Sequence, residues 1–398
     1  MLKLSIMNHG APFVEEVRSL LAQFRQNTRI EVRLRVLDWR DAWTELVQAA
    51  IHTDGPDVSE IGNTWLSEFV NMTVLRAFLP AEIARLGGSQ QFLPSVWRSG
   101  ITPVASSSAR QSWAVPWLAD MRLIHYRQDL FDQAGVEART AFESPQTLLK
   151  TCARLQAAGI AKPIALPLRR SRMTLHNVAG WVWGNGGEFI SADGKQAQFV
   201  TDQAKAAIYA YFDLARFMPS KLSDLDENQS DRLFLSGQAA MTISGPWLQR
   251  SPDLANNVAE HVRQALLPGV PYLGGSQLVI WRHAPYAEPA LKLIQHLSSV
   301  AAQTRLVQAS GLLPTRLEVL TQEPFQDDSF YQRVAAGLKT GRTFPVLALW
   351  GMVENNLTEA FAAIWSDVFQ DPAADIHAIV DAHLAQVAQR LNSTLAAE

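Results

Sequence analysis

The sequence has little of the chemistry that cross-links a chain or holds a metal. Its 398 residues include one cysteine, Cys152, so no intramolecular disulfide can form. No CxxC motif or Cys/His cluster of the kind that binds zinc or an iron–sulfur centre is present. We therefore expect a fold stabilised by packing, with no metal and no organic cofactor.

An excess of one charge and long apolar runs are also lacking. The 35 Lys and Arg residues nearly balance 38 Asp and Glu residues, for a formal net charge of −3. A chain with this balance lacks the excess of positive charge that binds a nucleic-acid backbone or an anionic membrane. The most apolar region, 265–281, is interrupted by prolines and glycines, and no stretch reaches the ~18 apolar residues of a membrane span. The sequence predicts a soluble globular protein with no nucleic-acid partner.

Motifs of common enzyme classes are missing as well. The sequence has no GxGxxG, GxxxxGK[ST], GxSxG or HExxH motif. Paired carboxylates for glycoside cleavage are defined by their distance in space, so a glycoside-processing enzyme stays open as an alternative. The main expectation is a protein without catalytic residues.

What is present at the start is a regular alternation of elements. Apolar periodicity predicts strands over 2–6, 30–36 and 58–61 and helices over 12–24 and 39–51. This order is typical of a parallel sheet in an α/β fold, whose ligands bind at the carboxyl ends of the strands. The residues that follow those ends are His9, Asp38, Asn63, Thr64 and Trp65.

Helical patterns dominate from 129 to 263, and two stretches rich in small residues, 101–112 and 267–281, are candidate crossings between domains.

Twelve tryptophans are the most distinctive part of the composition. Trp43 and Trp365 lie at helical spacing among apolar residues, so we assign them to packing. Four others follow or interrupt turn-forming residues, where an indole face can stack on the C–H face of a sugar; burial in the core is the alternative for each of them. These four are Trp65, Trp183, Trp247 and Trp350.

Five blocks of the sequence, in order, resemble a known family. They are GPDVSEIGNTW (55–65), WAVPWLADMRLIHYRQDLFDQAGV (113–136), FLSGQAAMTISGPWL (234–248), LPGVPYLGGSQLVI (267–280) and the segment from Gln303 to Pro314. Together they resemble the extracellular solute-binding proteins of ABC importers, within the group that includes the maltose- and trehalose-binding proteins.

The resemblance implies a fold of two α/β lobes joined by several crossings, with a central cleft that closes on the ligand. By analogy, residues 1–114 plus 270–312 form the N-terminal lobe, and residues 115–269 plus 313–398 form the C-terminal lobe.

The resemblance also implies a set of ligand contacts. Trp65 and Trp247 would be aromatic contacts from the two lobes, and Trp350 a stacking residue of a late helix. Asp120 would accept hydroxyl hydrogen bonds, with a helix cap or surface ion pair as the alternative, whereas Arg122 is expected to be a structural partner of a nearby acid. The expected contacts are His9, Asp38, Asn63, Thr64, Trp65, Asp120, Trp183, Gly245, Trp247, Gly274, Gly275, Arg316 and Trp350.

The function implied is non-catalytic capture of a mono- to small oligosaccharide by a monomer that delivers it to membrane permease subunits. The first residues do not read as a signal peptide, so a periplasmic or extracytoplasmic location rests on the resemblance, with the export signal absent from this chain. Two further alternatives stay open. One is an anionic glycoside as cargo, bound through Arg316 or through Arg169, Arg170 and Arg172, and the other is a ligand sensor.

Overall fold

The chain folds into two compact units. The computed structural model describes residues 1–52, 55–104, 107–219, 224–371 and 373–397. Unit 1 consists of Met1–Met121 and Leu273–Gly351, and unit 2 of Arg122–Tyr272 and Met352–Glu398.

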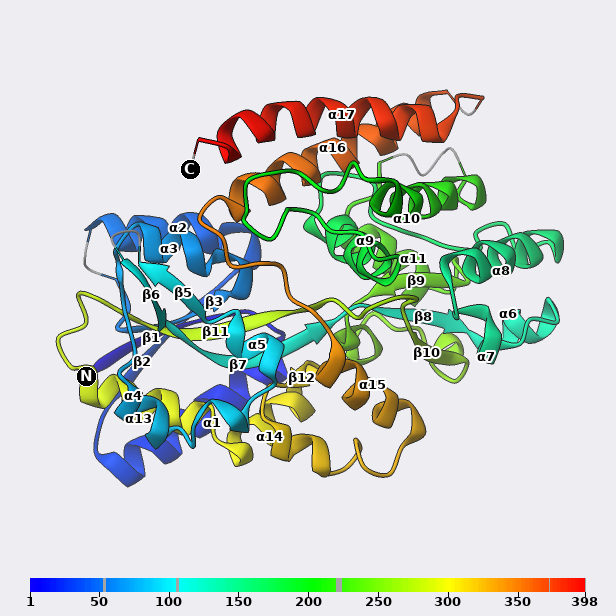
Figure 1. Ribbon diagram of the computed structural model, residues 1–398. Coiled ribbons are helices and arrows are strands. Elements are labelled where there is room, and N and C mark those ends of the chain that lie inside the picture. Colours follow the sequence, from blue (N-terminus) through cyan, green and yellow to red (C-terminus); the bar gives the residue numbers. More distant parts are fainter. Residues whose placement is uncertain (53–54, 105–106, 220–223, 372, 398) are drawn as a thin grey trace. The chain divides into compact units, whose positions relative to one another are not determined.

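Unit 1 is built on a seven-stranded mixed sheet with the order β12-β7-β11-β3-β1-β2, in which β4 also pairs with β11 (Figure 1). Its strands are β1 (Leu2–Met7), β2 (Val32–Leu37), β3 (Val58–Gly62), β4 (Leu75–Arg76), β7 (Ala114–Met121), β11 (Leu273–Trp281) and β12 (Leu313–Pro314). β1 runs parallel to both β2 and β3, which confirms the predicted parallel start of the sheet.

A separate pair, β5 (Ile101–Val104) and β6 (Ser107–Ser112), is antiparallel. It occupies the first candidate crossing, 101–112, of which residues 105 and 106 lie outside the described part of the chain.

Helices cover both faces of this sheet. α2 and α3 lie on one face, and α1, α13 and α14 on the other (Figure 1). α1 buries the apolar residues that define its predicted stripe, from Phe13 to Phe24. The helices of unit 1 are α1 (Ala11–Thr28), α2 (Trp39–His52), α3 (Leu66–Asn71), α4 (Pro80–Arg85), α5 (Pro94–Arg98), α13 (Ala287–Leu297), α14 (Val300–Ser310) and α15 (Ser329–Thr340).

Unit 2 has a smaller antiparallel sheet with the order β10-β8-β9. Its strands are β8 (Leu123–Arg127), β9 (Met241–Ser244) and β10 (Val262–Leu266). Its helices are α6 (Gln128–Gln133), α7 (Ala138–Ala141), α8 (Pro145–Ala157), α9 (Arg172–Gly184), α10 (Asp202–Phe212), α11 (Glu227–Leu235), α12 (Asn256–Ala259), α16 (Trp350–Gln370), which begins in unit 1, and α17 (Ile376–Leu395).

In unit 2, α10 packs against α9 and α17. Trp365 is fully buried there with its ring 4.6 Å from that of Phe212, so its assignment to packing is confirmed. Across the described residues, no helix combines the length and the apolar character needed to cross a membrane.

The unit boundaries differ from those implied by the resemblance, chiefly at the third crossing. That crossing was expected between 312 and 313, whereas residues 313–351 belong to unit 1. The reason is pairing with distant segments: β12 adds to the sheet beside β7, and the Ser95 hydroxyl donates to the Gly341 carbonyl at 2.6 Å. The second boundary, after Tyr272, falls within the predicted crossing 267–281.

Candidate ligand-binding site

The carboxyl edge of the sheet in unit 1 brings together the polar residues expected there. β7 and β3 are each antiparallel to β11, so β7 runs in the same direction as the three parallel strands. Asp120 near the end of β7 therefore lies at the same edge, paired with Gly274 in the register. The Asn63 side-chain amide donates to the Leu273 carbonyl at 3.5 Å, and Thr64 follows it in a short 3-10 helix, η1 (Asn63–Trp65).

His9 is held at this edge by a carboxylate that the sequence analysis missed. Glu60, in the middle of β3, is fully buried; its Oε1 lies 2.7 Å from His9 Nε2, and its Oε2 accepts a hydrogen bond from the Met7 amide at 2.6 Å. The only sequence signal for this role was a lone carboxylate within an otherwise uncharged strand. The bond fixes the orientation of the imidazole, which remains partly accessible.

Asp38 precedes α2 and accepts hydrogen bonds from Arg40 in the first turn of that helix. Its Oδ1 accepts from both the backbone amide and Nε of Arg40, each at 3.0 Å, and its Oδ2 accepts from Arg40 Nη2 at 3.1 Å. These hydrogen bonds lower the pKa of the Asp38 carboxyl to about 2. The side chain is therefore ionised at neutral pH and caps the helix.

Trp65 does not present an open indole at this edge. Its ring is 5% exposed and belongs to an apolar cluster, with its centroid 5.6 Å from Trp39 and 5.5 Å from Trp43, both in edge contact. The exposed indole here is that of Trp39, at 39%. The sequence analysis assigned the neighbouring Trp43 to packing and did not single out Trp39.

Gly274 and Gly275 lie within the strand β11. At Gly275, φ is +123°, and an added Cβ would overlap the Leu118 carbonyl on β7. The close approach of β7 and β11 thus requires glycine at this position.

Two further expected contacts pack inside unit 1. Trp350 is 1% exposed and stacks on Phe344 with ring centroids 4.5 Å apart. Arg316, also buried, donates to the Ser298 carbonyl at 2.7 Å and lies over the Phe92 ring at 4.3 Å. The structure therefore gives both residues packing roles, because Phe344 stacks on the Trp350 ring and the Ser298 carbonyl and Phe92 ring engage the Arg316 guanidinium.

In unit 2, the turn formed by Gly245 and the residues after it, called the Trp247 turn below, holds the half-buried indole of Trp247 in a fixed position. Trp247 follows β9 in a short 3-10 helix, η5 (Pro246–Arg250), and its indole folds back over Gly245, where an added Cβ would overlap the ring. The guanidinium of the buried Arg122 lies over the indole, 4.9 Å from its centroid. Gly245 is therefore needed for the ring position, a role the sequence had not specified.

His125 makes a hydrogen bond to the backbone of the same turn. Its Nε2 lies 2.9 Å from the Gly245 carbonyl, which can only accept, so this nitrogen carries the proton. Its Nδ1 then accepts from the Gln264 amide at 3.3 Å. Complete burial lowers the pKa of His125 to about 4, so the ring is neutral at physiological pH.

Asp231 of α11 is the acid near Arg122. Ser244 donates to its Oδ2 at 2.9 Å. Burial raises the pKa of Asp231 to about 7, although the Ser244 hydrogen bond and the Arg122 charge act in the opposite direction. Arg122 therefore fits its expected role as the structural partner of an acid, and it also contacts the Trp247 ring.

Trp183 belongs to a second aromatic group of unit 2 and is almost fully buried. Its ring lies parallel to that of Tyr272, with centroids 6.3 Å apart, and Tyr272 stacks on His176 at 4.3 Å. Beside this group, the buried carboxylate of Glu354 lies 3.8 Å from His176 Nε2.

The three arginines of the 169–172 segment each have a carboxylate partner. Arg169 pairs with Asp224, Arg170 with Glu359 at 3.4 Å and Arg172 with Glu354 at 3.5 Å. Their charges are thus already compensated within unit 2.

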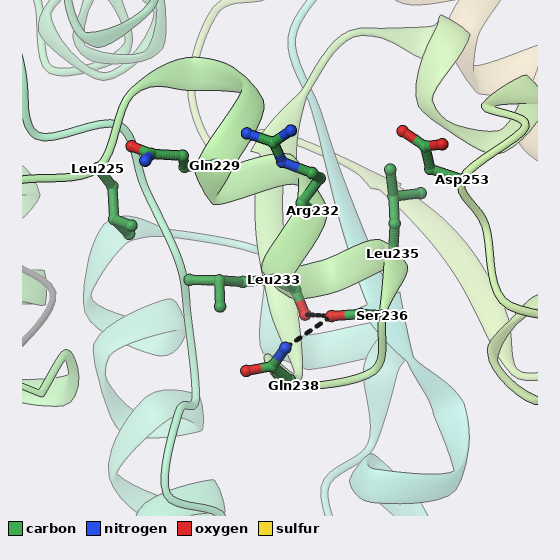
Figure 2. Close-up of a pocket in the computed structure, with 8 residues that line it drawn as sticks. All are labelled: Leu225, Gln229, Arg232, Leu233, Leu235, Ser236, Gln238 and Asp253. Carbon is green, nitrogen blue, oxygen red and sulfur yellow. Dashed lines mark hydrogen bonds between the residues drawn. The ribbon is translucent and has the colours of Figure 1, made fainter.

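A pocket of about 480 Å³ lies elsewhere in unit 2, around α11 (Figure 2). Its lining residues are Leu225, Gln229, Arg232, Leu233, Leu235, Ser236, Gln238 and Asp253. The Gln238 amide donates to the Ser236 hydroxyl, and that hydroxyl donates to the Leu233 carbonyl, so the polar groups at its base bond one another. No expected ligand contact lines this pocket. Within the described ranges, no group of three or more His, Cys, Asp or Glu side chains is arranged to hold a metal ion.

Comparison with known proteins gives a consistent answer. The sequence profile of the family described as bacterial extracellular solute-binding protein matches residues 10–304. The diacetylchitobiose binding protein DasA of Streptomyces coelicolor is 25% identical over 352 residues, which cover 85% of this chain and 78% of that protein.

Solved structures confirm the predicted fold class. A solute-binding protein of an ABC transporter from Thermotoga lettingae, bound with alpha-D-tagatose, superposes with a TM-score of 0.83 at 20% identity, covering 99% of each chain. Maltose-bound MalE3 of T. maritima gives a TM-score of 0.81 at 22% identity and covers 99% of this chain and 100% of its own.

Proposed function

We propose, since this chain belongs to the family of bacterial extracellular solute-binding proteins, that it binds a neutral sugar without altering it. In this proposal a monomer working outside the cytoplasm delivers the sugar to the permease of an ABC importer. The ligand in this proposal ranges from a monosaccharide to a small oligosaccharide. The tagatose, maltose and diacetylchitobiose named for its relatives support a ligand of this class.

The observation that carries the proposal is the Trp247 turn. Arg122 and the His125–Gly245 hydrogen bond fix the position of the indole, which is nevertheless only half-buried. A rigid, accessible aromatic ring suits the C–H face of a sugar, because little conformational entropy is lost when the two stack.

The charge distribution favours a neutral ligand over an anionic one. The arginines proposed as anion receptors are engaged with carboxylates or, for Arg316, with backbone carbonyls. The edge of unit 1 adds a carboxylate instead, that of Asp120 near the end of β7. Carboxylates accept hydrogen bonds from hydroxyl groups and repel an anion.

A thermal-shift screen against neutral sugars tests the proposal. A ligand that binds only the folded state raises the melting temperature, and Trp247→Ala should abolish that rise whereas Trp247→Phe should keep part of it. Tyr286→Ala, which removes an exposed aromatic of unit 1, is the matched control and should leave the rise unchanged. A rise that survives Trp247→Ala contradicts the assigned contact.

Two companion assays separate the alternatives. Phosphorylated sugars that bind more tightly than their neutral parents would favour an anionic cargo. Release of product from a glycan panel, lost on substitution of one carboxylate, would favour a glycoside-processing enzyme over a binding protein.

A further inference from the structure

Trp39 is the one large apolar side chain left accessible among the polar residues at the carboxyl edge of unit 1, as far as the described residues show. It is the first residue of α2, directly after the end of β2, and 39% of it is exposed. In contrast, Trp65 of the same cluster is 5% exposed. An exposed indole forgoes the burial that normally stabilises such a large apolar side chain.

The Trp39 ring is nevertheless fixed in place. The cap that Asp38 forms with the Arg40 amide at 3.0 Å sets the first turn of α2 and therefore the backbone of Trp39. The indole then makes two edge contacts, with His9 at 5.7 Å and an interplanar angle of 69°, and with Trp65 at 5.6 Å and 67°. Its conformation is thus determined by the buried Trp65 and by His9, which Glu60 holds in place, although much of its own surface is open.

The surroundings of Trp39 suit a polyhydroxylated ring. His9 is oriented by buried Glu60 through a 2.7 Å contact, and the Asp38 carboxylate lies on the adjacent residue. An apolar face beside groups that accept or donate hydrogen bonds is the combination that a pyranose requires, with C–H groups on its faces and hydroxyl groups at its rim.

We propose that Trp39, with His9 beside it, is the aromatic contact of unit 1 for the ligand, and that Trp65 is the buried support beneath it. This inference rests on the proposed function. It reassigns the unit 1 contact from the turn after β3 to the start of α2. The ligand it fits is a neutral sugar that lays the C–H face of one ring on the Trp39 indole.

Paired variants test the reassignment by calorimetric titration with the sugar found in the wild-type screen. Trp39→Ala should weaken binding about 30-fold, the size expected for loss of a central aromatic contact, and Trp39→Phe should weaken it less. Trp65→Phe should lower the melting temperature but change the dissociation constant less than about threefold. Tyr286→Ala again serves as the exposed control.

Hydroxyl-radical footprinting of the wild-type protein gives a measurement that does not depend on the folding of a variant. Trp39 should be oxidised readily without sugar and be protected at saturating sugar, whereas Trp65 should react slowly in both states. Unchanged oxidation of Trp39 on sugar binding, or a Trp39→Ala variant that binds as tightly as wild type, overturns this inference alone. A wild-type protein that binds no sugar in the panel overturns the proposed function and this inference together.

Discussion

Two turns of this protein have the same local structure, but the tryptophan is buried in one turn and half-buried in the other. Each follows a strand with glycine and a short 3-10 helix: η1 after β3 in unit 1 and η5 after β9 in unit 2. In the first turn Trp65 is buried beneath Trp39 and Trp43, whereas in the second Trp247 stays half-buried against Arg122.

The difference lies in what distant segments place beside each ring. Indoles from α2 cover Trp65 and complete an apolar cluster. At Trp247 the neighbour is instead the guanidinium of Arg122. Its electrostatic attraction to the ring face holds the indole in place without covering it with apolar side chains. A strand–glycine–tryptophan pattern therefore predicts a turn but not the accessibility of its aromatic ring.

Removing the cation should have the largest effect on the Trp247 turn. Arg122→Leu leaves the half-buried Asp231 without its compensating charge and releases the indole, at a cost of about 3 kcal/mol in the free energy of unfolding. Urea titration monitored by circular dichroism measures this loss. We expect the double variant Arg122→Leu/Asp231→Asn to lose less than the sum of the single variants. Additive losses would show that the two side chains do not interact.

Two titratable groups next to the Trp247 turn, Asp231 and His125, should give stability slopes of opposite sign. The folded pKa of Asp231, about 7, is above its usual 3.8, so its contribution to stability is present below pH 3.8 and is lost as the pH rises through 7. The folded pKa of His125, about 4, is below its usual 6.5, so its contribution is present above pH 6.5 and is lost as the pH falls through 4.

Melting curves of the wild type, Asp231→Asn and His125→Gln between pH 4 and 8 separate these two contributions. Asp231→Asn should gain stability relative to wild type as the pH rises towards 8, and His125→Gln should gain relative to wild type as the pH falls towards 4. Parallel curves for all three proteins would contradict the assignment of these slopes.

Gly62 and Gly245, which precede the two tryptophans, allow the most direct comparison of the two turns. Their substitution should have the smallest effects on the free energy of unfolding. An alanine Cβ at 245 would overlap the Trp247 ring, whereas one at 62 would lie 3.4 Å from the Trp65 ring, close to an ordinary contact. Gly245→Ala should therefore displace its indole and cost about 2 kcal/mol, together with weaker sugar binding. Gly62→Ala should cost less than about 1 kcal/mol and leave binding unchanged. Equal losses in unfolding free energy would show that the two turns are not different after all.

The sequence by itself determined the local elements and the start of the sheet. Alternation at Leu2, Leu4 and Ile6 predicted β1, and the apolar stripe from Phe13 to Phe24 predicted α1, because periodicity reports which face of an element is buried. The parallel order of β1, β2 and β3 followed, and it placed His9, Asp38 and Asn63 at one edge of the sheet.

Only the tertiary structure decided which side chains at those positions are accessible and which segment joins which unit. Periodicity does not specify what other segments bring to a surface. Trp43 and Trp39 cover Trp65, Phe344 stacks on Trp350, Glu60 orients His9, and the pairing of β12 with β7 places 313–351 in unit 1. Each of these outcomes depends on contacts between different elements, and apart from the Phe344–Trp350 stack these elements are far apart in the chain, where no local pattern carries the information.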